Sequence, residues 1–456
     1  MIYFSFPWHI IIYMINQSIF KSYDVRGIYP GQLDEAAAFA IGRAFVKHTG
    51  AKNIVVGYDA RLSSPALFNA LTQGLLSHGA RVTSISQTPT EGLYFAVANY
   101  DVEAGIMITA SHNPKEYNGF KMMVRNGSDI TWIRGKDLVP FVEDSVFTKS
   151  DAEIKELDIW PDYLKLMDSF FDAKNIKPFN IVVDASNGVI GSVIEKIKDR
   201  LPVKITPLHF EPDGNFPNHS PNPLDEGAAK QIWAAIKKEK ADFGFMFDGD
   251  ADRIFLVDEN GQMVSADIVL LLLAKHFLLK NPGMGIAYNL ICSRSVPEFV
   301  KQWGGVPIRT QVGFVNVREG LINNNGIMGG ELSAHYCFAD YFACDSGIIA
   351  FLTLLQIISK ENKPVSHMVK DLTIYAKPLQ LTFTAKDQGV ILEKVKEKYI
   401  NGKQDYLDGV TVEYEHWWFN LRPSNTEPLL KLTIEADTKE LLEQKKEELS
   451  RFIFGA

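Results

Sequence analysis

Residues 53–85 read NIVVGYDARLSSPALFNALTQGLLSHGARVTSI, and this stretch indicates how most of the chain folds. A short apolar run ends in a polar loop, apolar residues then recur at helical spacing, and a second short apolar run follows. A strand, a loop, a helix and a strand in this order predict two parallel strands joined by a right-handed crossover. Because the apolar runs do not alternate strictly with polar residues, the sheet is expected to be covered on both faces.

The same order of elements recurs twice. Asn180–Val183 is followed by DASNG, a helical SVIEKIKD and a strand-like VKITPL, and Gly285–Asn289 is followed by CSRS, VPEFVKQWG and VPIRT. The C-terminal part differs, because LQLTFTA, VTVEYE and LLKLTIEAD alternate apolar and polar residues as half-buried antiparallel strands do. The sequence therefore predicts three similar mixed α/β domains and a smaller C-terminal α+β domain, with limits at 19–158, 159–264, 265–373 and 374–456.

Composition fits a soluble protein of several domains. The chain has 456 residues, of which 46% are hydrophobic and 22% charged, and this length is too great for one core. A net charge of −8 argues against a general nucleic-acid binder, because phosphate backbones require clustered cations. Three cysteines without metal-type spacing make a reducing cytoplasm the simplest interpretation.

The N-terminal segment MIYFSFPWHIIIYM is apolar. It is shorter than the roughly 20 residues of a membrane-spanning helix, and it lacks the basic flank of a signal peptide. Met14 begins a stretch that reads as an ordinary cytoplasmic start. We interpret residues 1–18 as an N-terminal extension whose first 13 residues lie upstream of the native start, and we expect no membrane partner.

A hydroxyl beside an imidazole follows a short apolar run in GIMITASHNPKEYNGFK, residues 105–121. Ser, Asn and Pro favour turns, so a simple turn is one interpretation of this segment. A chemical role for Ser111 is the other. Cations near the motif, Arg26, Arg61 and Lys121, would attract a phosphate dianion if they gathered at one site.

Acidic residues follow a second apolar run in ADFGFMFDGDADRIFLVDENG. Asp248, Asp250 and Asp252 stand at alternate positions of a tight loop, where they can face one hard divalent cation such as Mg²⁺. An EF-hand is excluded, because Arg253 occupies the position at which its sharp turn requires glycine, and because the flanks resemble strands. The pattern predicts a Mg²⁺ site.

Two further loops carry polar groups in tight arrangements. In GGELSAH, Glu331, Ser333 and His335 would point the same way if the segment were extended, and a carboxylate beside a hydroxyl suits vicinal sugar hydroxyls. The loop NLRPSNTEP presents a guanidinium, two hydroxyls and an amide, which suit a phosphate group. Polar turns without a ligand are the alternative for both loops.

TASHNP, DGDADR, GELSAH and RPSNTEP, in this order and at domain-sized intervals, resemble the motifs of the α-D-phosphohexomutase superfamily, and most closely those of bacterial phosphomannomutase/phosphoglucomutase. The resemblance covers nearly the whole chain from about Ile19. It implies four domains around a central cleft, each of which contributes one loop. It also implies a phosphohexomutase that exchanges hexose 6-phosphate and hexose 1-phosphate through a phosphoserine and a hexose 1,6-bisphosphate.

The resemblance also implies a role for each matching residue. Ser111 would carry the phosphoryl group, and with Asp248, Asp250 and Asp252 it would hold one Mg²⁺ per chain. Arg26, His112, Lys121 and Arg253 would be catalytic, with His112 or Lys121 as the general acid and base. The residues expected to bind substrate are Tyr23, Glu331, Ser333, His335, Arg422, Ser424, Asn425 and Thr426.

The chain departs from the family pattern at two positions. Phe314 stands where many relatives have a histidine, which puts a substrate contact in doubt, and Ala334 replaces a common glycine. Mannose is the expected sugar and glucose a second one, because contacts at C3 and C4 cannot distinguish the two. Phosphoglucosamine mutase, a metal-dependent sugar phosphatase and a non-enzymatic sugar-phosphate-binding protein are the alternatives. We further predict a cytoplasmic monomer or homodimer whose partners are small hexose phosphates.

Overall fold

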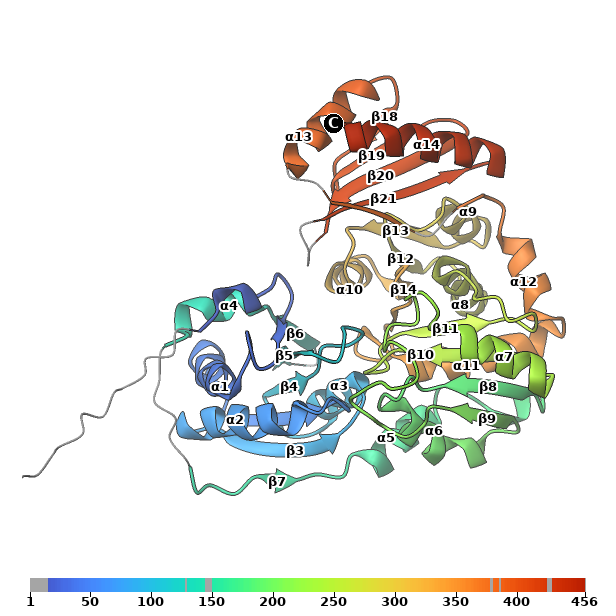
Figure 1. The fold of residues 1–456 in the computed structure, drawn as a ribbon. Coiled ribbons are helices and arrows are strands. Elements are labelled where there is room, and N and C mark those ends of the chain that lie inside the picture. Colours follow the sequence, from blue (N-terminus) through green and yellow to red (C-terminus); the bar gives the residue numbers. More distant parts are fainter. Residues whose placement is uncertain are drawn as a thin grey trace, which may run out of the picture. The chain divides into compact units, whose positions relative to one another are not determined.

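The computed structural model describes residues 15–127, 129–143, 150–377, 380–384, 387–424 and 429–455. The chain divides into two compact units. Unit 1 comprises residues up to Ile159 together with Asp213–Asn215, and unit 2 comprises Trp160–Pro212 and the chain from Phe216 onward. Figure 1 labels the helices and strands of both units.

Unit 1 is built on a seven-stranded sheet in the order β1-β5-β4-β2-β3-β7, with β6 paired to β5. Residues 53–85 fold as predicted, because β2 and β3 are parallel and α2 joins them. The strands are β1 (Val25–Ile28), β2 (Asn53–Tyr58), β3 (Arg81–Gln87), β4 (Ala104–Ile108), β5 (Tyr117–Asn126), β6 (Asp129–Ile133) and β7 (Lys155–Glu156). The helices are η1 (Gln17–Ile19), α1 (Glu35–Thr49), α2 (Ser64–Ser77), α3 (Thr90–Asn99), α4 (Gly135–Leu138) and η2 (Val139–Phe141).

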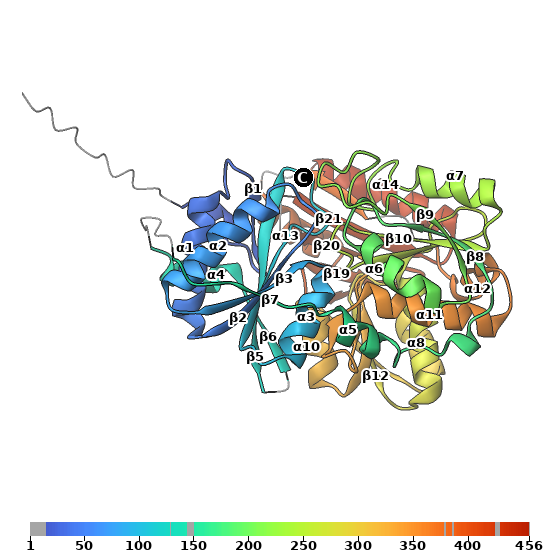
Figure 2. The same ribbon diagram turned by 90° about the horizontal axis from the view of Figure 1, so that it is seen from below.

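Helices cover both faces of this sheet, as the apolar strand runs predict (Figure 2). Ile106 and Ile108 of β4 belong to the core that β4 shares with α1 and α2. Gly105, which precedes Ile106 and therefore faces the opposite side of the strand, faces α3, because a Cβ there would lie 2.5 Å from Val97. On the face that α1 and α2 cover, these two helices pack closely against each other, since a Cβ on Gly74 would lie 2.1 Å from the carbonyl oxygen of Phe39.

Unit 2 contains three further sheets. The first has the order β11-β10-β8-β9 and the second the order β13-β12-β14-β15-β16. The strands are β8 (Asn180–Asp184), β9 (Lys204–Leu208), β10 (Phe243–Phe247), β11 (Ile254–Val257), β12 (Gly285–Asn289), β13 (Val306–Thr310), β14 (Gly326–Gly330), β15 (Tyr336–Phe338) and β16 (Cys344–Asp345). The helices are α5 (Trp160–Met167), η3 (Ala173–Asn175), α6 (Ile190–Ile197), η4 (Lys198–Arg200), α7 (Lys230–Glu239), α8 (Ala266–Lys280), α9 (Ser295–Gln302), α10 (Phe314–Asn323), α11 (Gly347–Glu361) and α12 (Val365–Leu372).

The helix α11 joins these two sheets into one hydrophobic layer. Twelve of its residues are buried, including Phe351. The ring of Phe351 packs edge-on against Phe245 of β10, with the centroids 5.0 Å apart. A helix that is apolar on nearly all sides must be covered on all sides, and α11 is therefore held between its own domain and the sheet of the preceding one.

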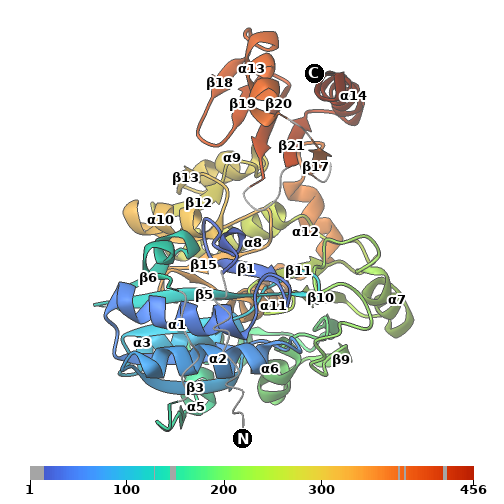
Figure 3. The same cartoon turned by 60° about the vertical axis from the view of Figure 1, so that its left-hand side comes forward.

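The third sheet of unit 2 is antiparallel throughout, as the alternating pattern predicts, and has the order β17-β21-β20-β19-β18. Its elements are β17 (Leu381–Thr384), α13 (Gln388–Lys398), β18 (Lys403–Asp405), β19 (Val410–Glu413), β20 (Trp417–Pro423), β21 (Leu429–Ala436) and α14 (Lys439–Gly455). The two helices lie over one face of the sheet (Figure 3), where Val395, Phe419 and Leu449 share a core. The predicted fold class of three mixed α/β domains and an α+β domain is confirmed.

The four motif loops share one position in this fold. Each connects two neighbouring antiparallel strands: β4 to β5, β10 to β11, β14 to β15 and β20 to β21. Because the two strands of each pair are bonded to one another, both ends of every motif loop are fixed by backbone hydrogen bonds. The strand–helix pattern of the sequence did not predict these hairpins.

A buried ion pair anchors the segment that leads into the C-terminal domain. Lys377 Nζ lies 2.6 Å from Asp267 Oδ2 and donates to the carbonyl oxygen of Ile291. Burial alone would raise the pKa of Asp267, but Lys377 and the donors Ser265 and Ser293 outweigh it and hold that pKa below its ordinary value. The pair therefore stabilises the fold at neutral pH, and its contribution is lost as the pH falls below the pKa of an unfolded aspartate.

We expect Lys377→Met to lower the free energy of unfolding by about 3–5 kcal/mol, because it leaves a buried carboxylate without its cation. Urea denaturation at pH 7 measures this loss. The matched control is Lys363→Met, because the Lys363–Asp371 pair has the same 2.6 Å separation but an exposed carboxylate, and this variant should unfold like the parent. Equal losses in both variants would contradict the prediction.

Candidate active site

Ser111 lies in the loop that follows β4. It is 2% exposed, and its backbone adopts a left-handed conformation with φ 51°, which side-chain-bearing residues rarely adopt. Its amide donates to Thr109 Oγ1 at 2.8 Å, and its Oγ lies 3.2 Å from His112 Nδ1. The loop thus presents a hydroxyl within hydrogen-bonding reach of an imidazole.

The guanidinium of Arg61 holds this loop in place. It donates to the carbonyl oxygens of Ser111 and Asn113 through Nη2 and to those of Pro114 and Tyr117 through Nη1. Its Nε lies 3.1 Å from Asp59, whose pKa is raised by burial. Four carbonyl contacts and a buried carboxylate occupy this guanidinium. Arg61 therefore supports the loop and is not the phosphate-attracting cation that the sequence suggested.

The other predicted residues of unit 1 lie around the same hairpin. Arg26 of β1 donates to Asn113 Oδ1 at 2.8 Å and pairs with Asp24, so it is tied to the Ser111 loop. Lys121 of β5 lies opposite Met107 of β4, and its Nζ is 3.4 Å from Thr90 Oγ1. Tyr23 is half-buried in the segment that precedes β1.

Asp248, Asp250 and Asp252 lie between β10 and β11 and are almost completely buried. Each offers one carboxylate oxygen, and these oxygens lie within 4.8 Å of one another. Three buried carboxylates repel unless a cation lies between them, and an all-oxygen donor set is the one that Mg²⁺ prefers. The donor chemistry of this loop therefore fits the predicted metal.

The backbone of this loop turns sharply. Ala251 has a left-handed conformation with φ 64°, a position at which glycine is favoured, and the Arg253 amide donates to Asp248 Oδ1 at 3.2 Å. Behind the loop, Ser186 Oγ donates to the carbonyl oxygen of Phe247, and the amide of Val189 donates to that of Gly249. A neighbouring loop thus supports the acidic one.

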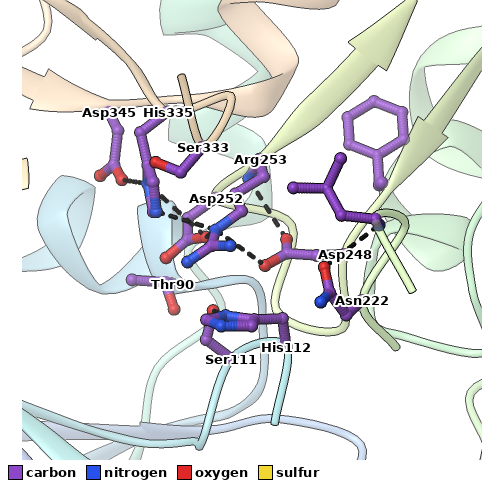
Figure 4. A network of polar contacts seen from close by, with 12 residues as sticks. Thr90, Ser111, His112, Asn222, Asp248, Asp252, Arg253, Ser333, His335 and Asp345 are labelled. Carbon is purple, nitrogen blue, oxygen red and sulfur yellow. Dashed lines mark hydrogen bonds and ion pairs between the residues drawn. The ribbon is translucent and has the colours of Figure 1, made fainter. Parts of the chain in front are cut away.

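Arg253 and His335 connect the acidic loop to the GELSAH loop (Figure 4). Arg253 Nε donates to His335 Nε2 at 2.9 Å, and His335 Nδ1 lies 2.6 Å from Asp345 Oδ2. Burial lowers the pKa of His335, but Asp252 and Asp345 outweigh it, so the pKa lies above its ordinary value. Because Nε2 of His335 accepts the bond from Arg253, this nitrogen carries no proton while that bond exists.

Glu331 and Ser333 lie side by side, but not for the expected reason. An extended segment is wrong, because the amide of Ala334 donates to the carbonyl oxygen of Glu331 and closes a turn at Ala334, φ 70°. Within this turn Ser333 Oγ is 3.3 Å from Glu331 Oε2. The other carboxylate oxygen accepts from Asn289 Nδ2 and from the amide of Gly313, which fixes the orientation of the carboxylate.

The remaining predicted positions are resolved in part. Arg422 is the last residue but one of β20, is 5% exposed, and contacts the carbonyl oxygen of Pro423. The Ser424 amide donates to the carbonyl oxygen of Leu429. Asn425 and Thr426 lie outside the described residues. Phe314 begins α10 with its ring 5.9 Å from that of His335, so it packs against a predicted site residue.

Sequence patterns missed the supporting roles of three residues: Arg61, Asp345 and Asn289. Each acts on a site residue that is at least 10 positions away in the chain, and none belongs to a motif. The one available signal was GYDAR, in which a carboxylate and a guanidinium directly follow a buried strand just as the acidic loop does.

Four family models match the chain in sequence order: phosphoglucomutase/phosphomannomutase domains I, II and III, the alpha/beta/alpha domains, at residues 17–135, 161–261 and 265–375, and the C-terminal domain at 383–451. The chain belongs to this family. The predicted superfamily, and with it the isomerase class of phosphohexomutases, is therefore confirmed.

Relatives in this phosphoglucomutase/phosphomannomutase family are similar over nearly their whole length. A phosphomannomutase of Vibrio cholerae is 36% identical over 96% of this chain and 99% of its own. A phosphomannomutase/phosphoglucomutase of Pseudomonas aeruginosa is 34% identical over 94% and 93%. A solved family protein from Burkholderia thailandensis superposes with a TM-score of 0.87 at 32% identity and covers 96% of this chain and 98% of its own.

More distant structures share the fold alone. An N-acetylglucosamine-phosphate mutase in its product complex has a TM-score of 0.57 at 14% identity and covers 95% of this chain and 96% of its own. Within the part of the chain that the structure describes, no helix is both long enough and apolar enough to cross a bilayer.

Proposed function

We propose that this phosphohexomutase interconverts mannose 6-phosphate and mannose 1-phosphate, with glucose phosphates as second substrates. The observation that carries the proposal is the Ser111 loop, in which a buried hydroxyl is held in a strained backbone by four carbonyl contacts from Arg61. Strain of this kind is retained at functional sites. The names of the relatives support mannose as the sugar.

In the proposed cycle, Ser111 carries a phosphoryl group and donates it to the free hydroxyl of a hexose monophosphate. The bond from phosphorus to Ser111 Oγ breaks, the bond to the sugar oxygen forms, and the sugar proton passes to His112 or Lys121. The hexose 1,6-bisphosphate then turns around and returns its other phosphoryl group to Ser111. A trace of the bisphosphate restores any chain that has lost its phosphoryl group.

Phosphoryl transfer depends on positioning and on neutralising the charge of the phosphoryl oxygens. Asp248, Asp250 and Asp252 would hold Mg²⁺, which when bound supplies positive charge beside the phosphoserine. Arg253 adds a fixed cation 3.7 Å from Asp248. This scheme requires that the Ser111 loop and the acidic loop face one another, which is part of the proposal.

The other loops would position the substrate. Glu331 would accept hydrogen bonds from the 3- and 4-hydroxyls and Ser333 would donate to them, in either orientation of the sugar. His335 would contact a phosphate through its proton. Arg422, Ser424, Asn425 and Thr426 would bind the phosphate that is not reacting. Tyr23 would also bind substrate, and Arg26 would act as a catalytic residue. The proposed domain limits remain 19–158, 159–264, 265–373 and 374–456.

A coupled assay with Mg²⁺ and a trace of bisphosphate tests the substrate. We expect kcat/KM for mannose 1-phosphate and glucose 1-phosphate to agree within about tenfold, and that for glucosamine 1-phosphate to be lower by at least about tenfold. A preference for glucosamine 1-phosphate would identify a phosphoglucosamine mutase. Release of inorganic phosphate as fast as isomer forms would identify a phosphatase, and binding without turnover a binding protein.

We expect Glu331→Gln to lower kcat/KM roughly 10- to 100-fold, because a hydrogen bond to a charged group contributes about 1.5–3 kcal/mol. The bonds from Asn289 and Gly313 hold the amide oxygen inward, so the variant presents an NH₂ group to the sugar. The matched control is Glu361→Gln, since Glu361 at the end of α11 pairs with Lys275. Unchanged kinetics for Glu331→Gln would remove this residue from the sugar site.

A further inference from the structure

A second group of potential metal ligands lies in unit 2, apart from the acidic loop. Asp184 ends β8, His209 directly follows β9, and His219 comes from the segment between β9 and α7. The strands β8 and β9 are parallel, with Asp184 opposite Leu208, so Asp184 and His209 lie at the same edge of the sheet. Parallel sheets bind ligands at this carboxyl edge.

The three side chains converge; Asp184 is buried and the two histidines are partly buried. His209 Nδ1 lies 3.0 Å from Asp184 Oδ1, and His219 Nε2 lies 3.1 Å from Asp184 Oδ2. The exposed fractions of the side chains are 0% for Asp184, 9% for His209 and 5% for His219. One ligand atom from each lies within 4.8 Å of the others. Ligands of a tetrahedral zinc ion lie roughly 3.4 Å apart, so small side-chain rotations suffice.

Hydrogen bonds on the far side of each ring determine which nitrogen carries a proton. His219 Nδ1 is 2.8 Å from the carbonyl oxygen of Ser220, which can only accept. His209 Nε2 is 2.9 Å from Gln231 Oε1, and the amide group of Gln231 donates to the carbonyl oxygen of Asn218, which fixes the side chain with its oxygen toward the histidine. Both rings therefore hold their proton away from Asp184.

The near nitrogens, His209 Nδ1 and His219 Nε2, then present lone pairs to the oxygens of one carboxylate. This contact is favourable only if each nitrogen gains a proton or if a cation lies between the three groups. Two protonated rings with centroids 5.0 Å apart would place two positive charges against one negative charge. One divalent cation satisfies all three ligand atoms, and an oxygen acceptor behind each imidazole is the usual environment of metal-binding histidines.

We propose that Asp184, His209 and His219 bind a late first-row divalent cation such as Zn²⁺, at a structural site distinct from the Mg²⁺ loop. Nitrogen ligands select this class of metal, whereas an all-oxygen set suits Mg²⁺. The site lies behind the acidic loop, because the amide of Ser186 donates to Asp184 Oδ1 and its Oγ donates to the carbonyl oxygen of Phe247. Bound metal would hold residues 184–189 in the position that supports the acidic loop.

The test is Zn²⁺ binding to the full chain by equilibrium dialysis in excess Mg²⁺, which occupies the oxygen site. We expect the parent to bind one Zn²⁺ per chain. The double variant His209→Gln/His219→Gln should bind Zn²⁺ with an affinity at least about 100-fold lower, and Gln231→Leu with an affinity lower by about 10-fold or more. Bound Co²⁺ should show visible absorption bands that the double variant lacks.

Two controls separate this site from others. Asp250→Asn removes an oxygen ligand of the Mg²⁺ loop and should keep the Zn²⁺ affinity, so the result does not depend on the proposed mutase reaction. His416→Gln removes an exposed histidine that lies 2.8 Å from a single carboxylate, Asp437, and should also keep it. No stoichiometric Zn²⁺ in the parent, or undiminished binding in both the double variant and Gln231→Leu, would overturn the proposal. Gln231→Leu decides the matter if the double variant fails to fold.

Discussion

Replacing Ser111 by alanine is expected to reduce turnover of mannose 1-phosphate by roughly 10⁴-fold or more, since removal of a nucleophile leaves only binding and electrostatic effects. The hydroxyl of Thr109, two residues earlier, is already engaged. Thr109 Oγ1 already donates to Asp59 and accepts from the Ser111 amide. The coupled assay measures the loss, and mass spectrometry of the intact chain should show one phosphoryl group on the parent and none on the variant.

The matched control is Ser86→Ala. Ser86 of β3 also has a left-handed backbone, with φ 55° against 51° for Ser111, so alanine meets similar strain at both positions. Ser86 is exposed and bonds to Glu156, well outside the predicted site residues of its unit. This control should keep full activity. Turnover within tenfold of the parent in Ser111→Ala would refute the phosphoserine cycle.

Replacing Asp250 by asparagine is expected to have two opposite effects. Mutase activity should fall by about three orders of magnitude, because several kcal/mol of charge stabilisation disappear with the metal. In EDTA, however, the variant should be more stable than the parent by roughly 1–2 kcal/mol, as is common when a strained active site is relaxed. The reason is that one of three converging buried carboxylates becomes neutral.

The coupled assay measures the mutase activity, and thermal unfolding with and without Mg²⁺ measures the stability. The parent should be stabilised by Mg²⁺, and Asp250→Asn should respond much less. Asp242→Asn is the control, because Asp242 precedes β10 at the opposite end of the strand and bonds to the Asn180 amide. If Asp250→Asn were destabilised in EDTA as much as a core variant, the carboxylates would be stabilising each other through protons, and the metal-site interpretation would fail.

The sequence predicted the fold where its signals are local. Apolar runs and helical spacing placed the parallel pair β2 and β3, and strict alternation placed the antiparallel C-terminal sheet. Both patterns depend on which face of a single element is buried. The hairpins that carry the motif loops were not predicted, because the pairing of β4 with β5 or of β14 with β15 depends on contacts between strands.

In the candidate site, too, features that depend on neighbouring residues could be predicted, and features that depend on contacts between strands could not. The acidic triplet could be recognised because Asp248, Asp250 and Asp252 are neighbours in sequence, and they converge as expected. The turn at Ala334 could not, since the alternation of Glu331, Ser333 and His335 is equally compatible with an extended segment. The contact of Asp345 with His335 could not be predicted for a different reason, because it depends on the register of β14, β15 and β16.

The hairpin position of the four motif loops has a consequence for how this chain can be altered. A segment whose two ends are bonded to each other can be exchanged as a cassette between family members, because its anchoring strands keep their spacing whatever the inserted residues are. The segment between β14 and β15 is therefore a suitable place to graft residues from a relative, because the paired strands on either side stay unchanged.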